Sequence, residues 1–372
     1  MKHIITAVGA LALTTTLAQA GGIDRSGTSY AALFEKGRVA TIGFSSVSPS
    51  VSGVFTHPLA GAIPTGNMSE SYATLSFSLK GDINDKLSYA VFLNQPYGAD
   101  ANYKEGIYDG LEAHWKSTQL AALLKYNISE RISVYGGLRL VNSSAKINIP
   151  VQMLAPPATP IVIGPYNAKT DTNNQVGYVV GAAYEIPDIA LRVALTYESS
   201  IKHKFATAER FGGLNGGATI GGETEITMPQ SVTLDFQSGV AKDTLVFGSV
   251  TWSEWSKWHV RPTYYDAVLH DEITGFSNNV ITYELGVGRR INAALSVFAR
   301  IGYEDADGEV ASRLSPTDGR RSIGVGGSWT KDNMKITGGL EYVKLGDTVD
   351  ASGTKFSGND AVGVGVNIAF TF

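Results

Sequence analysis

The sequence predicts an all-β protein, a transmembrane antiparallel β-barrel of about 14 strands with a short N-terminal hatch in its lumen. Three observations predict this fold. Apolar residues recur at every second position through most of the chain, which is the period of a strand and not of a helix. Short turns and long loops alternate along the chain. The number of candidate strands is even, as it is in single-chain bacterial outer-membrane barrels.

The first residues are typical of a secretory signal peptide, which we assign to residues 1–20. Lys2 and His3 form a short polar head, and a mostly apolar, uncharged run follows to Leu17. Residues 18–20 have the small-x-small pattern of a cleavage site. The apolar run is shorter than the ~20 residues of a membrane-spanning helix, which favours a cleaved leader over an anchor. We divide the remaining chain into a hatch at 21–38 and a barrel at 39–372.

The strands are predicted from the alternation alone. The chain ends on "AVGVGVNIAFTF", in which valine, isoleucine and phenylalanine occupy every second position and small or polar residues lie between them. We expect this last strand to pair with the first, with its apolar face toward lipid. The predicted strands are 39–52, 70–80, 86–96, 116–126, 131–149, 172–186, 190–203, 223–240, 244–259, 278–290, 294–304, 319–329, 334–344 and 358–372.

The connections indicate a membrane barrel. A meander with all its short turns on one rim and all its long loops on the other is the arrangement of outer-membrane barrels. A secreted soluble sandwich or propeller would also have one apolar face per strand. The polar face is mainly Gly, Ser, Thr and Ala, which suits a packed lumen better than a soluble surface. Aromatic residues also gather near strand ends, where interfacial girdles lie: Tyr126, Tyr184, Tyr197, Trp252, Trp255, Trp258, Tyr303, Phe370 and Phe372. The predicted location is the bacterial outer membrane, with its lipid as a partner.

The composition excludes several classes of function. The net charge is −4, from 30 basic and 34 acidic residues, and no basic run could attract nucleic acid. Cysteine is absent, which excludes thiolate metal sites and cysteine nucleophiles. No two histidines of the exported chain have metal-ligand spacing on a shared strand face, and "HWKS" at 114–117 is the nearest local match to a nucleophile with a base. We therefore expect no enzyme activity, no catalytic residues, no metal site and no cofactor.

Three arginines alternate with apolar neighbours and should point into the lumen: Arg139, Arg192 and Arg300. One interpretation is that they pair with the inward-facing carboxylates in an internal network, because an unpaired buried charge is costly. These carboxylates are Glu198, Asp235, Glu284, Glu304 and Glu341. The other is that one or more of them binds the carboxylate of a ligand.

One long loop is unusually apolar for an exposed segment. "VQMLAPPATPIVIGPY" at 151–166 carries Met153, Leu154, Ile161, Val162 and Ile163. Contiguous exposed apolar surface often marks a binding site, so these residues are candidate ligand contacts on the outer loops. The alternative is that the loops pack on one another as a lid.

A short apolar cluster precedes the first strand. Tyr30, Leu33 and Phe34 are expected to fold into the lumen as a hatch, because a barrel of this size encloses more space than its wall side chains fill. The alternative is a disordered periplasmic tail.

Several segments resemble the FadL/TodX family of outer-membrane transporters for long-chain fatty acids and other hydrophobic compounds. Residues 228–258 resemble a strand pair of the family that begins on Pro-x-Ser-Val and closes on Trp-x-x-Trp-Ser. Here these are Pro229, Ser231 and Val232, then Trp252, Trp255 and Ser256. Residues 195–205 and 314–329 and the C-terminal strand are also similar. The Asn-Pro-Ala motif common in the hatch of the family is missing here.

The resemblance implies a route for a ligand. The ligand would be captured on the apolar outer loops, pass to a lumen pocket, and leave sideways through a gap in the wall at the third strand. Here that gap falls at Pro96, Tyr97 and Gly98, and Pro96 cannot donate a ladder hydrogen bond. By resemblance to other outer-membrane barrels, Phe372 is the signal read by the barrel-assembly machinery.

The expected function is a passive channel for hydrophobic small molecules, with long-chain fatty acids as the first choice. The alternatives are a general or anion-preferring porin and a structural or adhesive surface barrel. We expect a monomer, since a complete barrel has no free edge strand.

Overall fold

The computed structural model describes residues 22–25, 29–154 and 163–372, so the predicted signal peptide at 1–20 lies outside the described residues. The described chain forms a closed barrel of 14 antiparallel strands, as the alternation predicted. Ten of the strands are continuous: β1 (Val39–Ser50), β4 (Tyr72–Asp82), β7 (Glu112–Asn127), β8 (Ile132–Ile149), β15 (Thr244–Ser253), β18 (Val280–Arg290), β19 (Leu295–Glu304), β20 (Arg320–Lys331), β21 (Met334–Leu345) and β24 (Asp360–Thr371).

The other four barrel strands are interrupted, and each consists of two segments. They are β5 (Leu87–Asn94) with β6 (Gly98–Asn102), β9 (Tyr166–Thr170) with β10 (Asn173–Ile186), β11 (Leu191–Glu198) with β12 (Ile201–Phe211), and β13 (Ile220–Met228) with β14 (Ser231–Ala241). We refer to β5 and β6 together as the third strand.

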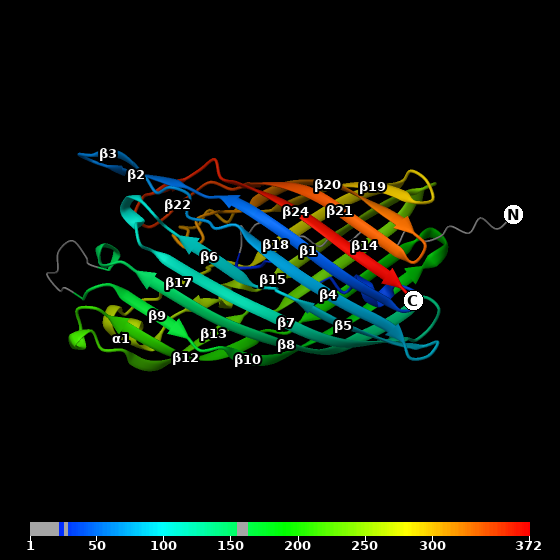
Figure 1. The fold of residues 1–372 in the computed structure, drawn as a ribbon, viewed down its shortest axis with the longest axis horizontal. Helices are drawn as coiled ribbons and strands as arrows, with labels where there is room; N and C mark the ends of the chain where they lie inside the picture. The colour runs from blue at the N-terminus through cyan, green and yellow to red at the C-terminus, as the bar shows by residue number, and fades with distance from the viewer. Residues whose placement is uncertain (1–21, 26–28, 155–162) are drawn as a thin grey trace.

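The barrel closes between its first and last strands. β24 pairs with β1 over its whole length, from Val39↔Thr371 to Ser50↔Asp360. Figure 1 shows the red β24 beside the blue β1. The other edge of β1 pairs with β4, so the closed ladder leaves neither terminal strand with an open edge.

The apolar face of the wall points outward. On β24, Val362, Val364 and Val366 are between 40% and 49% exposed, whereas Gly363 and Gly365 are buried. The alternation is therefore the reverse of that in a soluble barrel, and it presents an apolar surface to lipid.

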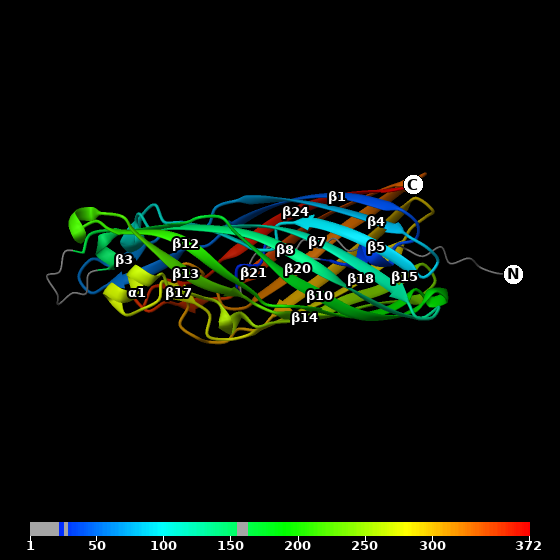
Figure 2. The same ribbon diagram turned by 90° about the horizontal axis from the view of Figure 1, so that it is seen from below.

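One rim of the barrel carries the short turns, and the other rim carries the long loops. The C-terminus lies at the rim with the short turns, while the hairpin of β2 (Gly53–His57) and β3 (Gly61–Pro64) and the short helix α1 (Thr263–Leu269) lie at the other (Figures 1 and 2). That outer rim also carries β16 (His259–Val260) paired with β17 (Thr274–Gly275), and β22 (Thr348–Val349) and β23 (Lys355–Phe356) extending the hairpin into a four-stranded sheet. The 3-10 turns are η1 (Ala31–Phe34), η2 (Gly106–Tyr108), η3 (Val151–Met153), η4 (Pro187–Ile189), η5 (Asn215–Gly217) and η6 (Trp255–Lys257). Within the described ranges, no helix is long and apolar enough to span a membrane.

Several predicted boundaries are wrong. The predicted loop at 97–115 contains β6 and the start of β7, and the loop at 204–222 contains most of β12 and the start of β13. Strands extend into these loops because neighbouring backbone groups satisfy one another there. The predicted strand 223–240 breaks at Pro229, which has no N–H to donate. The predicted strand 244–259 ends at Ser253, before the η6 turn.

Candidate functional site

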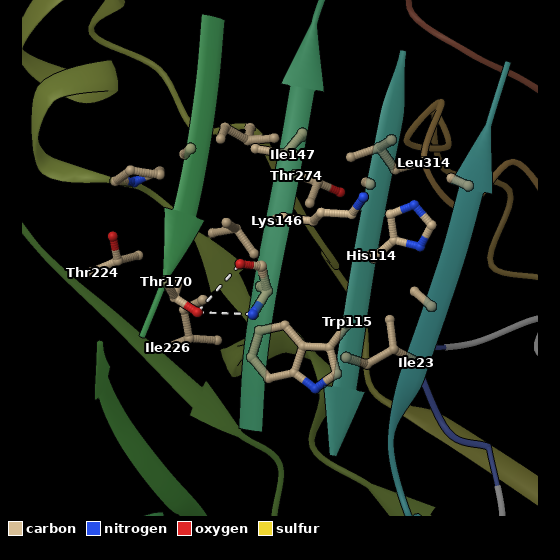
Figure 3. A pocket seen from close by; sticks show the side chains of 18 of the residues that line it. Ile23, His114, Trp115, Lys146, Ile147, Thr170, Thr224, Ile226, Thr274 and Leu314 are labelled. Carbon is tan, nitrogen blue, oxygen red and sulfur yellow. Dashed lines mark hydrogen bonds between the residues drawn. The ribbon is translucent and has the colours of Figure 1, made fainter. Parts of the chain in front are cut away.

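An apolar cavity lies inside the outer half of the barrel, and we call it the inner pocket. Its volume is about 90 Å³. Figure 3 shows Ile23 and Trp115 at one end and Ile147 and Leu314 at the other. The walls come from segments that are far apart in sequence: Ile23, Ala99, Ala101, Ala113, His114, Trp115, Ala145, Lys146, Ile147, Ala168, Thr170, Thr207, Thr224, Ile226, Trp258, Val260, Pro262, Ile273, Thr274, Phe276, Leu314 and Ser315.

The hydroxyl groups in the inner pocket already have partners. Thr170 Oγ1 accepts from the Ala145 N–H at 2.8 Å, which is one of the dashed lines in Figure 3. Thr207 Oγ1 donates to Thr224 Oγ1 at 2.7 Å. The pocket therefore behaves as an apolar surface despite its threonines.

Two basic side chains belong to strands at the edge of the inner pocket, and both contact carboxylates. The Lys146 ammonium lies 2.7 Å from Glu112 and is half exposed. The His114 ring lies between Asp100 and Glu112, with its Nε2 2.7 Å from Glu112. Neither side chain is therefore available to a ligand without first leaving these carboxylates.

Aromatic rings form one side of the inner pocket. Trp115 makes edge-to-face contacts with Phe205 and Trp258, at centroid separations of 5.6 and 6.3 Å. Trp258 also packs on Phe276 at 5.1 Å. The expectation that Trp255 and Trp258 belong to an interfacial girdle is wrong, because both indoles are at least 95% buried inside the barrel.

The barrel wall is open at one place beside the inner pocket. The ladder between β4 and the third strand stops at Phe77↔Leu93 and resumes only at the bridge Ser69↔Ala101. The third strand itself is interrupted between these points, at residues 95–97. We call this break the wall gap. It contains Pro96 and Tyr97 and adjoins Gly98, the residues predicted for a lateral opening.

The N-terminal segment fills the wall gap from inside. Arg25 N–H donates to the Pro96 carbonyl at 2.7 Å, and Gly98 N–H donates to the Ile23 carbonyl at 2.8 Å. The segment therefore adds a short strand to the broken third strand. Gly22 precedes it with φ +84°, and a Cβ there would lie 2.1 Å from the Trp255 ring, so only glycine fits.

The Arg25 side chain also helps to fill the wall gap. Its guanidinium lies 3.8 Å from the centroid of the Tyr72 ring and forms an ion pair with Asp100. A Cβ on Gly98 would lie 2.5 Å from the Arg25 side chain. Arg25, Tyr72, Gly98 and Asp100 line a second cavity of about 80 Å³, and Ala99 lines both cavities. The third strand and the N-terminal segment thus separate the inner pocket from the wall gap.

Asp24 is the bridge partner of Tyr97 in this added strand. It lies on the N-terminal segment and not on a membrane-spanning strand. Desolvation inside the barrel raises the pKa of its carboxyl to about 7. Near neutral pH this carboxyl is therefore partly protonated, which lowers the cost of holding it inside the lumen.

The predicted hatch residues lie inside the barrel at its other end. Leu33 is 1% exposed, and the Tyr30 hydroxyl donates to Glu198 at 3.0 Å. The Phe34 ring lies between two cations, the Lys125 ammonium at 4.4 Å and the Arg192 guanidinium at 4.7 Å. This end of the lumen is therefore occupied by the chain itself.

The three candidate arginines do not line the inner pocket. Arg139 is 1% exposed, forms an ion pair with Glu198, and donates to the Ser199 carbonyl at 2.6 Å. Arg300 forms an ion pair with Glu341, and Arg192 packs on the hatch. Arg139 and Arg300 therefore pair with lumen carboxylates, as one of the two sequence-based interpretations expected, whereas the contact of Arg192 is with an aromatic ring.

Replacing Arg139 with alanine is expected to destabilise the barrel by about 3–5 kcal/mol, because the buried Glu198 carboxylate would lose its partner. The free energy of unfolding in urea, measured on the purified protein in detergent, checks this. Arg289→Ala, at an exposed position, serves as the control. Equal stability of the two variants would show that the Arg139–Glu198 pair is not a structural element.

The described residues of the apolar loop pack inward. Leu154 and Ile163 are 6% and 5% exposed and belong to a cluster under the outer loops with Tyr166, Phe211 and Tyr265. Met153 packs against the same cluster. Ile161 and Val162 lie outside the described residues. Met153, Leu154 and Ile163 therefore pack against other outer-loop residues, whereas Val151 of the same loop is 39% exposed.

The comparisons with known proteins agree with this architecture. Residues 25–368 match the family described as outer membrane protein transport protein (OMPP1/FadL/TodX). No curated protein sequence matches the chain. A FadL homologue from Pseudomonas aeruginosa is similar in structure, with a TM-score of 0.72 and 14% identity over 92% of both chains.

Two further structures have the same fold. The toluene transporter TodX of Pseudomonas putida has a TM-score of 0.64 and 14% identity, over 95% of this chain and 96% of that one. The monoaromatic hydrocarbon channel CymD has a TM-score of 0.57 and 14% identity, over 91% of this chain and 89% of that one. At these identities the likeness shows the fold.

Proposed function

The chain belongs to the OMPP1/FadL/TodX family of outer-membrane transport proteins, and from that premise we propose that it admits long-chain fatty acids and other hydrophobic molecules by passive diffusion. Membership of the family establishes the general function, which is transport of hydrophobic compounds across the outer membrane. The proposed route runs from the outer loops to the inner pocket and then sideways through the wall gap.

The observation that carries this proposal is the position of the inner pocket. It is apolar, and the third strand, the N-terminal segment 23–25 and the loop residues Leu314 and Ser315 lie between it and the cavity at the wall gap. The opposite end of the lumen is filled by Tyr30, Leu33 and Phe34, so a sideways exit needs less rearrangement than an axial one. Burial of each CH₂ group of a ligand contributes about 0.8 kcal/mol, which is enough to draw a long chain out of water.

The ligand class rests on two lines of support. The resemblance of the sequence favours long-chain fatty acids, while two proteins of the same fold are a toluene transporter and a monoaromatic hydrocarbon channel. The arginines expected to bind a carboxylate have internal partners. We therefore propose that the apolar body of the ligand, and not an anionic head group, is what the inner pocket selects.

The remaining assignments are proposals of the same kind. Residues 21–38 form the hatch, and residues 39–372 form the barrel. Phe372 acts as the signal for the assembly machinery, and its side chain is 66% exposed at the end of the last strand. The closed ladder gives no edge for a partner strand, which supports a monomer.

Uptake measured in cells with and without the gene tests the proposal. Deletion is expected to slow the entry of labelled long-chain fatty acid and of labelled toluene, and a plasmid copy is expected to restore it. Slower entry of the fatty acid alone or of toluene alone would assign the ligand class. Unchanged entry of both would contradict the proposed function.

A further inference from the structure

Two buried indole groups beside the inner pocket have no hydrogen-bond partner. Among the described residues, the Nε1 atoms of Trp115 and Trp258 are inaccessible to solvent, and no acceptor lies within reach of either. Both side chains are 5% exposed, and their rings lie 6.3 Å apart. Both side chains line the inner pocket, and in this structure both indole nitrogens are covered by their neighbours.

Such donors are unusual in a protein interior. A buried N–H without an acceptor costs free energy, and buried tryptophan normally finds a partner. Phenylalanine would provide a similar apolar ring without this cost, and Phe205 and Phe276 do so in the same wall. The threonines of the pocket already bond to one another or to the backbone. An acceptor for the indoles has to come from outside the wall.

We propose that Trp115 and Trp258 recognise an oxygen acceptor on the ligand, so that the inner pocket prefers an apolar molecule with one neutral acceptor over a pure hydrocarbon. Suitable groups are the carbonyl of a ketone, an ester or a protonated carboxylic acid. This inference rests on the proposed function, because it assigns the ligand chemistry of the same pocket. It adds two specificity-determining residues to an otherwise apolar site.

An ionised head group fits the inner pocket less well. A carboxylate without a cation is expensive to bury. The basic side chains that line the pocket, His114 and Lys146, already contact Asp100 and Glu112. The indoles can donate to a neutral oxygen without disturbing these pairs.

Binding has to move some side chains. Both nitrogens are covered, and Figure 3 shows Ile23 beside the Trp115 ring. Ile23 belongs to the segment that fills the wall gap. An acceptor that reaches Trp115 therefore displaces part of the same segment that blocks the exit.

The test uses acetophenone and ethylbenzene, which have nearly the same shape and differ in one carbonyl oxygen. Their dissociation constants are measured by calorimetry on the purified full-length barrel in detergent, with protein-free micelles as the baseline. After this correction, the wild type is expected to bind acetophenone about threefold to tenfold more tightly than ethylbenzene. That ratio corresponds to the net free energy of one hydrogen bond. Trp115→Phe with Trp258→Phe is expected to remove that preference while leaving ethylbenzene binding within about twofold.

Controls separate this inference from the proposed function. Trp329→Phe, at a 41% exposed position on the wall, should keep the preference. The single variants Trp115→Phe and Trp258→Phe should each lose part of it, which provides a readout if the double variant does not fold. No preference in the wild type, or the same preference in the folded variants, would overturn the role of the indoles but leave the pocket as a ligand site. Failure of both probes to bind the wild type would overturn the pocket assignment in the proposed function as well.

Discussion

Filling the inner pocket is expected to abolish uptake while the barrel still assembles. Ala113 lies on β7 and lines the pocket, so Ala113→Phe places a phenyl ring in a cavity of about 90 Å³. The added benzyl group is comparable in size to toluene and would occupy space that either ligand needs. Uptake of labelled fatty acid and toluene is expected to fall at least about tenfold, while overpacking costs only about 1–3 kcal/mol of stability.

The same strand offers a matched control. Ala122 faces outward on β7 and is exposed, so Ala122→Phe adds the same ring on the lipid side. That variant is expected to transport like the wild type. If Ala113→Phe is folded and also transports like the wild type, the ligand does not pass through the inner pocket.

The barrel itself could be predicted from the sequence, because the residue pattern that produces a membrane strand lies within that strand. A strand with lipid on one side and a lumen on the other needs apolar residues at every second position. Val362, Val364 and Val366 show that pattern, and they are the exposed residues of β24. The alternation of short and long connections then gave the order of the strands and the two rims.

The breaks in the strands were harder to predict, because alternation continues across them. Ser199 and Ser200 interrupt β11 and β12 without any residue that forbids a strand. Pro229 and Pro96 do carry a signal, because neither can donate a ladder hydrogen bond. The family resemblance placed a gap at the third strand and Pro96 is consistent with a break there, but neither indicated what fills the gap.

The site could be predicted only in part because its contacts are long-range. The pairing of the N-terminal segment with the third strand joins residues more than 70 positions apart, and Arg25 has no local feature that indicates its ion pair with Asp100. Gly22 is the nearest feature in the sequence, but the need for glycine there is evident only from its close contact with the Trp255 ring in the structure. The aromatic wall likewise combines Trp115 with Trp258, and no strand pattern separates a girdle tryptophan from a pocket tryptophan.

Locking the N-terminal segment onto the third strand tests the sideways exit most directly. Asp24 and Tyr97 are antiparallel bridge partners, and the Cα atoms of such partners are about 4.5–5.5 Å apart, within the range of a disulfide. The chain has no cysteine, so Asp24→Cys with Tyr97→Cys gives a single possible crosslink. The oxidised protein keeps Arg25 in the wall gap, and the reduced protein is its own control.

The measurement is the rate of uptake of labelled fatty acid and toluene by cells carrying this double variant, before and after reduction. The account predicts that oxidation slows uptake of both at least about tenfold and that reduction restores it, because a bonded segment cannot leave the gap. Equal uptake by the oxidised and reduced forms, with the crosslink confirmed by mass spectrometry, would contradict the sideways route through the third strand.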